Sequence, residues 1–315
     1  MESERNFDLE TWAEAYKRLN QSYRRKLIYR FGTGGGFYSE LNGLLLAVLY
    51  ALDRGYRFEL YSRKADFCMG GGWTAIFEPF CPEYKNRLVG SCVLRDRRYN
   101  TLRNKVTSFY KLLNRNITED DVFWYTHTNR FAIAQYNIPE LGIINGSFKD
   151  AMRRLIPIVC RFNASFRREI DDFKQKMGLP EHYVSMHIRG GDKENETESF
   201  SPQAYVDAAA VRTTLRTAFV FTDDYRLFEE LRAGNPDWTF FTSATKEDAG
   251  YRNETFRAKG KEIRADLVKM FSSVKMILES DLFVGTFISN PAMFAGMLMD
   301  DEKLVGLDYL HWLLL

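Results

Sequence analysis

Residues 26–61 decide the fold, because two short apolar stretches flank a glycine-rich turn and a long apolar segment. They are KLIYRF (26–31), GTGGG (32–36), FYSELNGLLLAVLYALDR (37–54) and YRFELY (56–61). Short stretches rich in aliphatic and aromatic residues predict strands, and the long segment predicts a buried helix. A strand, a helix and a strand in this order form a βαβ unit, which predicts the opening of a doubly wound α/β domain.

The same alternation resumes after Gly178, where a long helix predicted over 148–177 ends. Strands are expected at 183–188, 217–222, 238–242, 281–285 and 303–307, and helices at 202–211, 225–232, 259–279 and 291–299. Strands that alternate with helices indicate a parallel sheet. We therefore predict an α/β fold with two Rossmann-like domains that face a cleft, one over 1–178 and one over 179–315.

The composition predicts a folded protein and excludes several other classes. The chain has 315 residues, of which 45% are hydrophobic and 15% aromatic, and 44 Lys and Arg against 42 Asp and Glu leave a net charge of +2. This balance argues against a nucleic-acid-binding protein. No stretch approaches the ~18 apolar residues of a membrane span, and the charged N-terminus does not resemble a signal peptide. Without a CxxC pair, zinc and redox motifs are not indicated. We expect a cytoplasmic protein with no transmembrane segment.

The segment HIRGGDK (187–193) is the first of three candidate site segments at strand ends, where open α/β sheets bind their ligands. Arg189 leaves the end of an apolar strand, and Gly190 and Gly191 expose backbone N–H groups. A guanidinium and free amides suit the oxygens of a pyrophosphate. The alternative is a tight turn in which Arg189 forms a structural ion pair with Asp192.

The other two segments, FTDD (221–224) and GTFISNP (285–291), also follow apolar strands. Two carboxylates, Asp223 and Asp224, resemble a metal-binding pair, but we favour a helix cap by this segment, with Thr222 or Asp223 as the capping residue. In GTFISNP, Ser289 or Asn290 is expected to cap a helix that begins at a proline. A helix N-terminus at the carboxyl end of a strand is an anion site.

The turn GTGGG (32–36) invites a dinucleotide-binding interpretation, which the spacing does not support. The pattern G-x-G-x-x-G requires glycine at position 37, which is Phe. No acidic residue ends the second strand, where Tyr61, Ser62 and Arg63 stand. An NAD-dependent oxidoreductase is therefore a weak alternative.

Six segments, taken in order over residues 32–310, resemble the α1,6-type fucosyltransferases, which include the core-fucosylating and nodulation-factor enzymes. They are GTGGGFYSELN (32–42), GGGWTAIFEPF (70–80), HIRGGDK (187–193) with FSPQAY (200–205), TDD (222–224), RADL (264–267) and SDLFVGTFISN (280–290). The resemblance implies a GT-B fold and an inverting, metal-independent transfer of fucose from GDP-fucose to a glycan hydroxyl. It implies no cofactor beyond the donor substrate. The N-terminal domain would hold the acceptor and the C-terminal domain the nucleotide.

The resemblance also implies roles for individual residues. His187 and Arg189 would contact the diphosphate and ribose, Asp266 the guanine side, and Ser289 and Asn290 a phosphate. Asp223 and Asp224 would order that site, and Tyr205 would line the donor pocket. The acceptor-activating base would be Glu196 or Glu198, which flank Thr197 at the family's position. The remaining donor contacts would come from Gly190, Gly191, Asp192 and Lys193.

One position departs from the family pattern, because Gly190 replaces its second arginine. The loss of a charge-assisted contact leaves two alternatives open. The chain would use another nucleotide sugar, or it would bind sugar nucleotides or glycans without catalysis. The acceptor is not readable from the sequence. The aromatic residues 123–125, with His127, would stack on a sugar or belong to the core.

Overall fold

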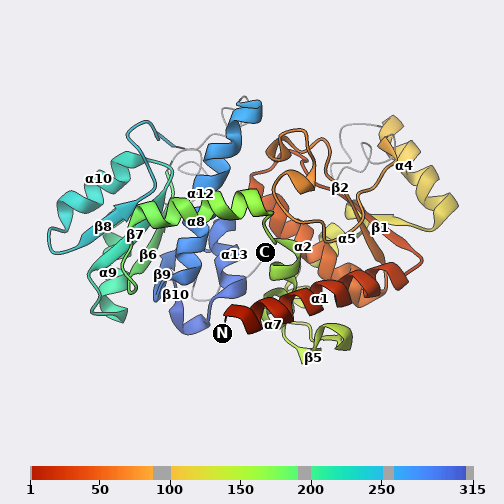
Figure 1. Ribbon diagram of the computed structural model, residues 1–315, viewed down its shortest axis with the longest axis horizontal. Helices are drawn as coiled ribbons and strands as arrows, with labels where there is room; N and C mark the ends of the chain where they lie inside the picture. The colour runs from red at the N-terminus through yellow and green to blue at the C-terminus, as the bar shows by residue number, and fades with distance from the viewer. Residues whose placement is uncertain (1, 88–100, 191–199, 251–258, 310–315) are drawn as a thin grey trace. The chain divides into compact units, whose positions relative to one another are not determined.

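The computed structural model (Figure 1) describes residues 2–87, 101–190, 200–250 and 259–309. The chain forms two compact units, and the boundary between them lies between Asn163 and Ala164. This boundary precedes the one predicted after residue 178. The helix predicted over 148–177 is in fact two helices, α7 (Phe148–Val159) and α8 (Ala164–Met177).

Tertiary contacts explain why that helix breaks. The Arg161 carbonyl accepts a hydrogen bond from the Glu78 amide at 2.7 Å, and the Asn163 amide donates to the Ile76 carbonyl at 3.0 Å. These bonds hold the connection in an extended conformation within the first unit. The following helix, α8, packs against α12 (Arg264–Glu279) of the second unit. Packing partners thus decide the boundary, although helical periodicity continues on both sides of it.

The first unit contains the predicted βαβ motif, with bounds within one residue of those expected. Strand β1 (Lys26–Arg30) leads to α2 (Phe37–Arg54) and β2 (Arg57–Tyr61), and β3 (Ile117–Thr118) completes a parallel sheet in the order β2-β1-β3. The other elements of the unit are α1 (Glu2–Ser22), α4 (Thr101–Asn114), α5 (Glu119–Thr126), α6 (Asn129–Ala132), α7 and the antiparallel pair β4 (Tyr136–Ile138) and β5 (Ile143–Gly146), with short 3-10 turns at Asp66–Cys68, Trp73–Ala75 and Pro139–Leu141. Thirteen of the 18 residues of α2 are buried, as its apolar sequence predicts.

The glycine-rich turn after β1 encloses a carboxylate of the protein itself. The buried Glu40 side chain accepts hydrogen bonds from the amides of Gly32, Thr33, Gly34 and Gly35, the last three at 2.8, 2.7 and 2.8 Å. Successive amides that point into one concavity form an anion site. Here α2 supplies the anion, so these amides are not available to a pyrophosphate, in agreement with the failed dinucleotide spacing.

The second unit is a five-stranded parallel sheet with helices on both faces. Its described elements are α8, β6 (Val184–Ile188), α9 (Pro202–Arg212), β7 (Thr217–Thr222), α10 (Tyr225–Gly234), β8 (Thr239–Thr242), α12, β9 (Leu282–Gly285), α13 (Asn290–Leu298) and β10 (Leu304–Gly306), with 3-10 turns at Gly260–Ile263 and Asp301–Lys303. All five predicted strands are confirmed. The sheet order is β10-β9-β6-β7-β8, so the direction of winding reverses between β6 and β9. Ligands of open α/β sheets bind at such a switch point.

Strand β6 divides its side chains between two cores. Val184, Met186 and Ile188 pack with residues of α9 and α10 on one face of the sheet. Ser185 and His187 alternate with them and therefore face the side on which α12 and α13 pack. At the switch point, His187 therefore lies on one face of the sheet, and the chain continues from Ile188 at the end of the strand.

Candidate functional site

An ion pair between Arg189 and Asp223 links two loops at the carboxyl edge of the sheet in the second unit. Arg189 follows β6, and its Nε lies 3.5 Å from the Asp223 carboxylate, which follows β7. The other Asp223 oxygen accepts the Gly190 amide at 2.8 Å. Arg189 therefore has an ion-pair partner other than the Asp192 of the alternative interpretation, and Asp192 lies outside the described residues.

The Gly190 amide does not contribute to a pyrophosphate cradle in this structure, because it already donates to Asp223. Arg189 remains a candidate, since 23% of its side chain is exposed at the switch point. A guanidinium carries five N–H donors in a planar fork, so one ion pair leaves further donors for oxyanion ligands. The charge of Arg189, and not the glycine amide beside it, is the feature that suits a diphosphate.

The segment FTDD forms a helix cap, as expected, but the capping residue is Asp224. Its carboxylate accepts the Arg226 amide at 2.9 Å at the start of α10. The Thr222 hydroxyl bonds to the Asp224 backbone, and neither Thr222 nor Asp223 caps α10. The Arg226 guanidinium, which reaches Asp224 Oδ2 at 2.5 Å, lowers the pKa of this buried carboxyl below its ordinary value.

Gly190 stands where no side chain fits without a shift of its neighbours. A Cβ atom at this position would lie 3.0 Å from Asp224 Cβ and 3.3 Å from Leu227 Cδ1. Gly190, which stands where the family pattern has an arginine, therefore packs tightly against α10. Arg226 lies between Asp224 and Leu227 in the first turn of α10, with 77% of its side chain exposed, and brings a guanidinium to the same loop.

We expect the substitution Gly190→Arg to lower the free energy of unfolding by about 2 kcal/mol, because it forces α10 away from the strand end. Urea unfolding followed by circular dichroism measures this loss. Gly234→Ala in α10 is the control, since its Cβ would meet only Gln203 Oε1 at 3.7 Å. A Gly190→Arg protein as stable as the control would contradict the packing argument.

His187 is a buried neutral side chain that connects β6 to the loop after β9. Only 2% of it is exposed, its ring stacks on Phe221 with centroids 4.8 Å apart, and its Nδ1 lies 3.3 Å from the Ser289 hydroxyl. Burial, together with the nearby charge of Arg189, lowers the pKa of His187 to about 3. A histidine that is neutral and enclosed orients its neighbours, and it brings no positive charge to a diphosphate.

We expect His187 to make the protein less stable in mild acid. An unfolded histidine has a pKa of about 6.5, so below this pH the unfolded chain binds a proton that the folded protein excludes. The contribution of His187 to the free energy of unfolding is fully present above about pH 7. It falls by up to about 1.4 kcal/mol per pH unit between about pH 6.5 and pH 3. His187→Gln should flatten this dependence in urea titrations at pH 7 and pH 5. Parallel profiles of the two proteins would contradict the assignment.

The third candidate segment, GTFISNP (285–291), leads into α13. Two of its backbone amides donate to a residue that the sequence analysis did not indicate. Ser289 is the N-cap residue and is buried, and Asn290 and Pro291 open the helix. The Asp308 carboxylate accepts the amides of Phe287 and Ile288 at 2.8 and 2.9 Å. Part of the expected anion site is therefore satisfied by the chain itself.

Tyr205 and Asp266 occupy different surroundings at this edge. Tyr205 is buried in the core between α9 and the sheet, its hydroxyl bonds to Thr286, and burial raises its pKa. Asp266 lies in the first turn of α12, where Lys259 Nζ is 2.7 Å from its carboxylate. Because α12 returns from β8 to β9, its first turn lies at the carboxyl edge of the sheet. The structure thus gathers Arg189, Asp223, Asp224, Asp266 and Ser289 at one edge.

Sequence reasoning missed three contributors to this edge, which are Arg226, Asp248 and Asp308. The Asp248 backbone carbonyl accepts the Tyr225 amide at 2.9 Å, and its side chain pairs with Lys269. This ties the loop after β8 to the start of α10. A carboxylate shortly after a predicted strand is a signal that would have indicated Asp308, whereas Asp248 lies in an irregular loop without a recognisable pattern.

Other candidates lie beyond what the structure describes. Gly191, Asp192, Lys193, Glu196 and Glu198 fall in residues 191–199, which are outside the described ranges. Within those ranges, no group of three His, Cys, Asp or Glu side chains has the arrangement of metal ligands. Metal independence and the choice of the base stay predictions.

The aromatic segment of the first unit is partly exposed. Trp124 on α5 is 77% exposed, and the rings of Phe123 and His127 lie 3.8 Å apart. His127 Nδ1 is 2.9 Å from the Phe123 carbonyl oxygen. A role in sugar stacking stays a prediction.

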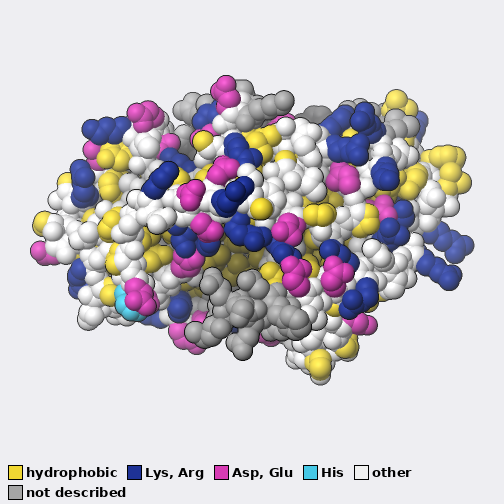
Figure 2. Space-filling model, in the orientation of Figure 1, with side chains coloured by type: hydrophobic (Ala, Val, Ile, Leu, Met, Phe, Trp, Pro, Cys, Tyr) yellow, Lys and Arg dark blue, Asp and Glu magenta, His cyan; other side chains and the backbone are white. Residues whose placement is uncertain are grey.

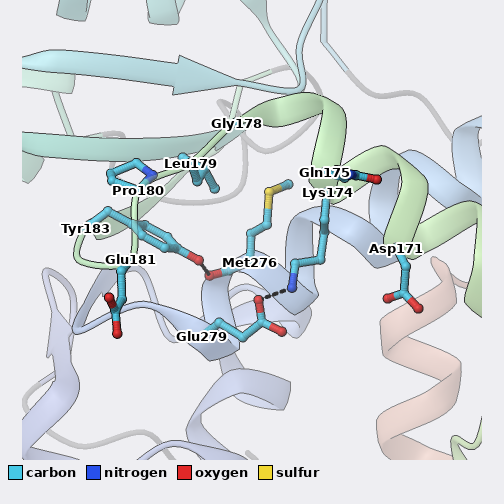
Figure 3. Close-up of a pocket in the computed structure, with 10 residues that line it drawn as sticks. All are labelled: Asp171, Lys174, Gln175, Gly178, Leu179, Pro180, Glu181, Tyr183, Met276 and Glu279. Atoms are coloured by element: carbon cyan, nitrogen blue, oxygen red, sulfur yellow. Dashed lines mark hydrogen bonds and ion pairs between the residues drawn. The ribbon is translucent and has the colours of Figure 1, made fainter.

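A cavity of about 440 Å³ lies in the second unit, away from the candidate site (Figure 3). It is lined by α8, by the connection that leads to β6 and by the end of α12. In the wall of the cavity, Lys174 forms an ion pair with Glu279, and the Tyr183 hydroxyl donates to the Met276 carbonyl at 2.7 Å. Because Tyr183 precedes β6, the cavity lies at the amino edge of the sheet, whereas the candidate site occupies the carboxyl edge.

Comparison with known proteins identifies the fold but no sequence family. No protein-family model matches the chain, and no curated protein matches it in sequence. The chain is similar in structure to the α1,6-fucosyltransferase NodZ soaked with GDP-fucose, with a TM-score of 0.52 and 15% identity over 87% of this chain and 93% of NodZ. NodZ co-crystallised with GDP gives 0.52 and 15% over 86% and 92%. The fucosyltransferase NodZ from Bradyrhizobium gives 0.52 and 14% over 87% and 93%.

The chain therefore has the fold of a GT-B fucosyltransferase. The fold class predicted from the βαβ patterns is confirmed, and the resemblance drawn from the six segments is confirmed at the level of the fold. No helix among the described residues combines the length and the hydropathy of a membrane span.

Proposed function

We propose that this protein is a glycosyltransferase that moves fucose from GDP-fucose to a hydroxyl group of a glycan acceptor. The observation that carries the proposal is the position of Arg189, which leaves β6 at the switch point of a parallel sheet. Its support is the fold shared with NodZ, whose structures were obtained with GDP-fucose and with GDP. In this proposal the second unit binds the nucleotide and the first unit holds the acceptor.

The proposed chemistry depends on stabilising the diphosphate that leaves. As the bond between the anomeric carbon and GDP breaks, negative charge grows on the diphosphate oxygens. Arg189 supplies a fixed positive charge at the switch point, and the N-terminus of α13 adds a favourable dipole. Asp223 holds the Arg189 side chain by an ion pair of 3.5 Å. The proposal assigns this stabilisation to the protein, without a metal ion.

Arg226 provides the second positive charge in this proposal. Gly190 leaves no space for the family's second arginine, but the exposed Arg226 guanidinium is held by Asp224 beside the same loop. We assign it to the nucleotide side of the donor. Buried His187 positions Ser289 and the strand end, and Asp266 faces the donor edge from α12.

The acceptor hydroxyl needs a base as it attacks the anomeric carbon from the face opposite GDP. Glu196 or Glu198 takes this proton in the proposed inverting mechanism. A cytoplasmic place for the reaction and a polysaccharide acceptor complete the proposal.

Turnover of GDP-fucose labelled in the sugar tests the proposal. The protein should release labelled fucose slowly by hydrolysis and transfer it faster when a suitable glycan is added, and EDTA should leave both rates unchanged. Full loss with EDTA and recovery with Mn²⁺ would overturn metal independence. Turnover of UDP-sugars instead would keep a glycosyltransferase and overturn the donor. Binding of GDP without any turnover would favour a non-catalytic nucleotide-binding protein.

A further inference from the structure

Helix α4 of the first unit exposes a stripe of large apolar side chains. Leu102, Phe109 and Leu113 are 69%, 64% and 64% exposed, and their spacing of seven and four residues places them on one face of the helix. The opposite side carries the contacts to the unit. Tyr110 packs against Tyr84 with ring centroids 6.4 Å apart, and Lys111 lies 2.7 Å from Asp121.

Positive charge surrounds this stripe. Between residues 101 and 118 the chain has four Lys and Arg and no Asp or Glu, although the whole chain carries a net charge of only +2. Lys105 and Arg115 are exposed at the helix, and Arg25 Nε donates to the Arg115 carbonyl at 3.1 Å. This bond brings exposed Arg24 and Arg25 to the end of α4. Among the described residues, no carboxylate forms an ion pair with Lys105, Arg115, Arg24 or Arg25.

Figure 2 shows the arrangement on one face of the molecule. Hydrophobic side chains gather at the end where α4 lies in Figure 1, and Lys and Arg side chains project beside them. We name the stripe Leu102, Phe109 and Leu113, with Lys105, Arg115, Arg24 and Arg25 around it, the α4 face. A helix with apolar side chains on one face and basic residues along its edge is typical of proteins that lie on a membrane surface.

We propose that the α4 face docks on the surface of an anionic phospholipid bilayer. The aliphatic and aromatic side chains enter the boundary between headgroups and acyl chains, and the four cations meet lipid phosphates. A second copy of the chain is a poor occupant, because a two-fold contact would place these cations against themselves. RNA is a poor occupant as well, because the two leucines offer neither a stacking plane nor a hydrogen bond to a base.

Cosedimentation with vesicles tests this proposal, independently of donor and acceptor. Vesicles of phosphatidylcholine with about 30% phosphatidylglycerol should bind the protein at about 0.05 M salt and much less at about 0.5 M salt, and pure phosphatidylcholine should bind little. Absence of binding to the anionic vesicles at low salt would overturn the proposal.

Two variants separate the apolar and the charged parts of the α4 face. Phe109→Ser with Leu113→Ser should lower the partition coefficient at least about tenfold, and Lys105→Glu with Arg115→Glu should abolish the preference for anionic lipid. The matched control is Ile133→Ser with Ile144→Ser, because these side chains are 76% and 71% exposed elsewhere in the same unit. Circular dichroism confirms that each variant is folded.

The outcomes distinguish the occupants. If the serine pair binds vesicles as tightly as the control pair, the α4 face is not the docking surface. If wild type binds an oligonucleotide more tightly than the vesicles, or forms a dimer that the serine pair abolishes, the lipid proposal is wrong. None of these results affects the nucleotide site, because α4 belongs to the other unit.

Discussion

Arg189→Ala should lower kcat/KM for GDP-fucose by a factor of about 100 to 1,000, since it removes a fixed positive charge from the departing diphosphate. The thermal midpoint should change little, because Arg189 is partly exposed and its ion pair of 3.5 Å contributes little to folding. Turnover of labelled donor and a thermal melt, made on the same preparation, measure the two effects.

Arg212→Ala is the matched control for this variant. Arg212 lies in the last turn of α9 and donates to the Glu302 carbonyl at 2.9 Å, so its removal takes away a charge of the second unit without touching the switch point. Arg189 would be structural instead if its variant lost several degrees of thermal midpoint while turnover per folded molecule stayed unchanged.

Glu40→Ala should lower the free energy of unfolding by about 3 kcal/mol, because the backbone amides that now share its carboxylate would lose their acceptor. Glu40→Gln should cost less, since its oxygen still accepts three of the amides, although its NH2 group then faces the Gly32 amide. Urea unfolding measures both variants.

The control for Glu40 is Glu14→Ala, which removes an exposed carboxylate paired with Lys17 on α1. This change should stay within about 0.5 kcal/mol. If Glu40→Ala were as mild as Glu14→Ala, the glycine-rich turn would not depend on the carboxylate that it encloses, and its amides would again be candidates for a ligand.

The strands were predictable because each is a short apolar stretch closed by a turn. Strand β6, for example, alternates between two cores, and both of its faces are buried, so an apolar pattern was sufficient to find it. The sequence was also sufficient to place Arg189 and Asp223 at strand ends.

Features that depend on contacts between distant residues were not predictable. The break between α7 and α8 depends on bonds from residues 161–163 to residues 76–78, and helical periodicity carries no record of them. The capping residue of α10 is Asp224 and not a neighbour, because Arg226 pairs with it. The space around Gly190 depends on where Leu227 lies, which a motif cannot express.

Binding of GDP compared with UDP, measured by thermal shift and by calorimetry, tests the central claim most directly. Ligand that binds only the native state raises the thermal midpoint by mass action. We expect GDP and GDP-fucose to stabilise the protein, UDP not to stabilise it, and the Arg189→Ala protein to lose the effect. Stabilisation by UDP alone, or an undiminished effect of GDP on the Arg189→Ala protein, would contradict it.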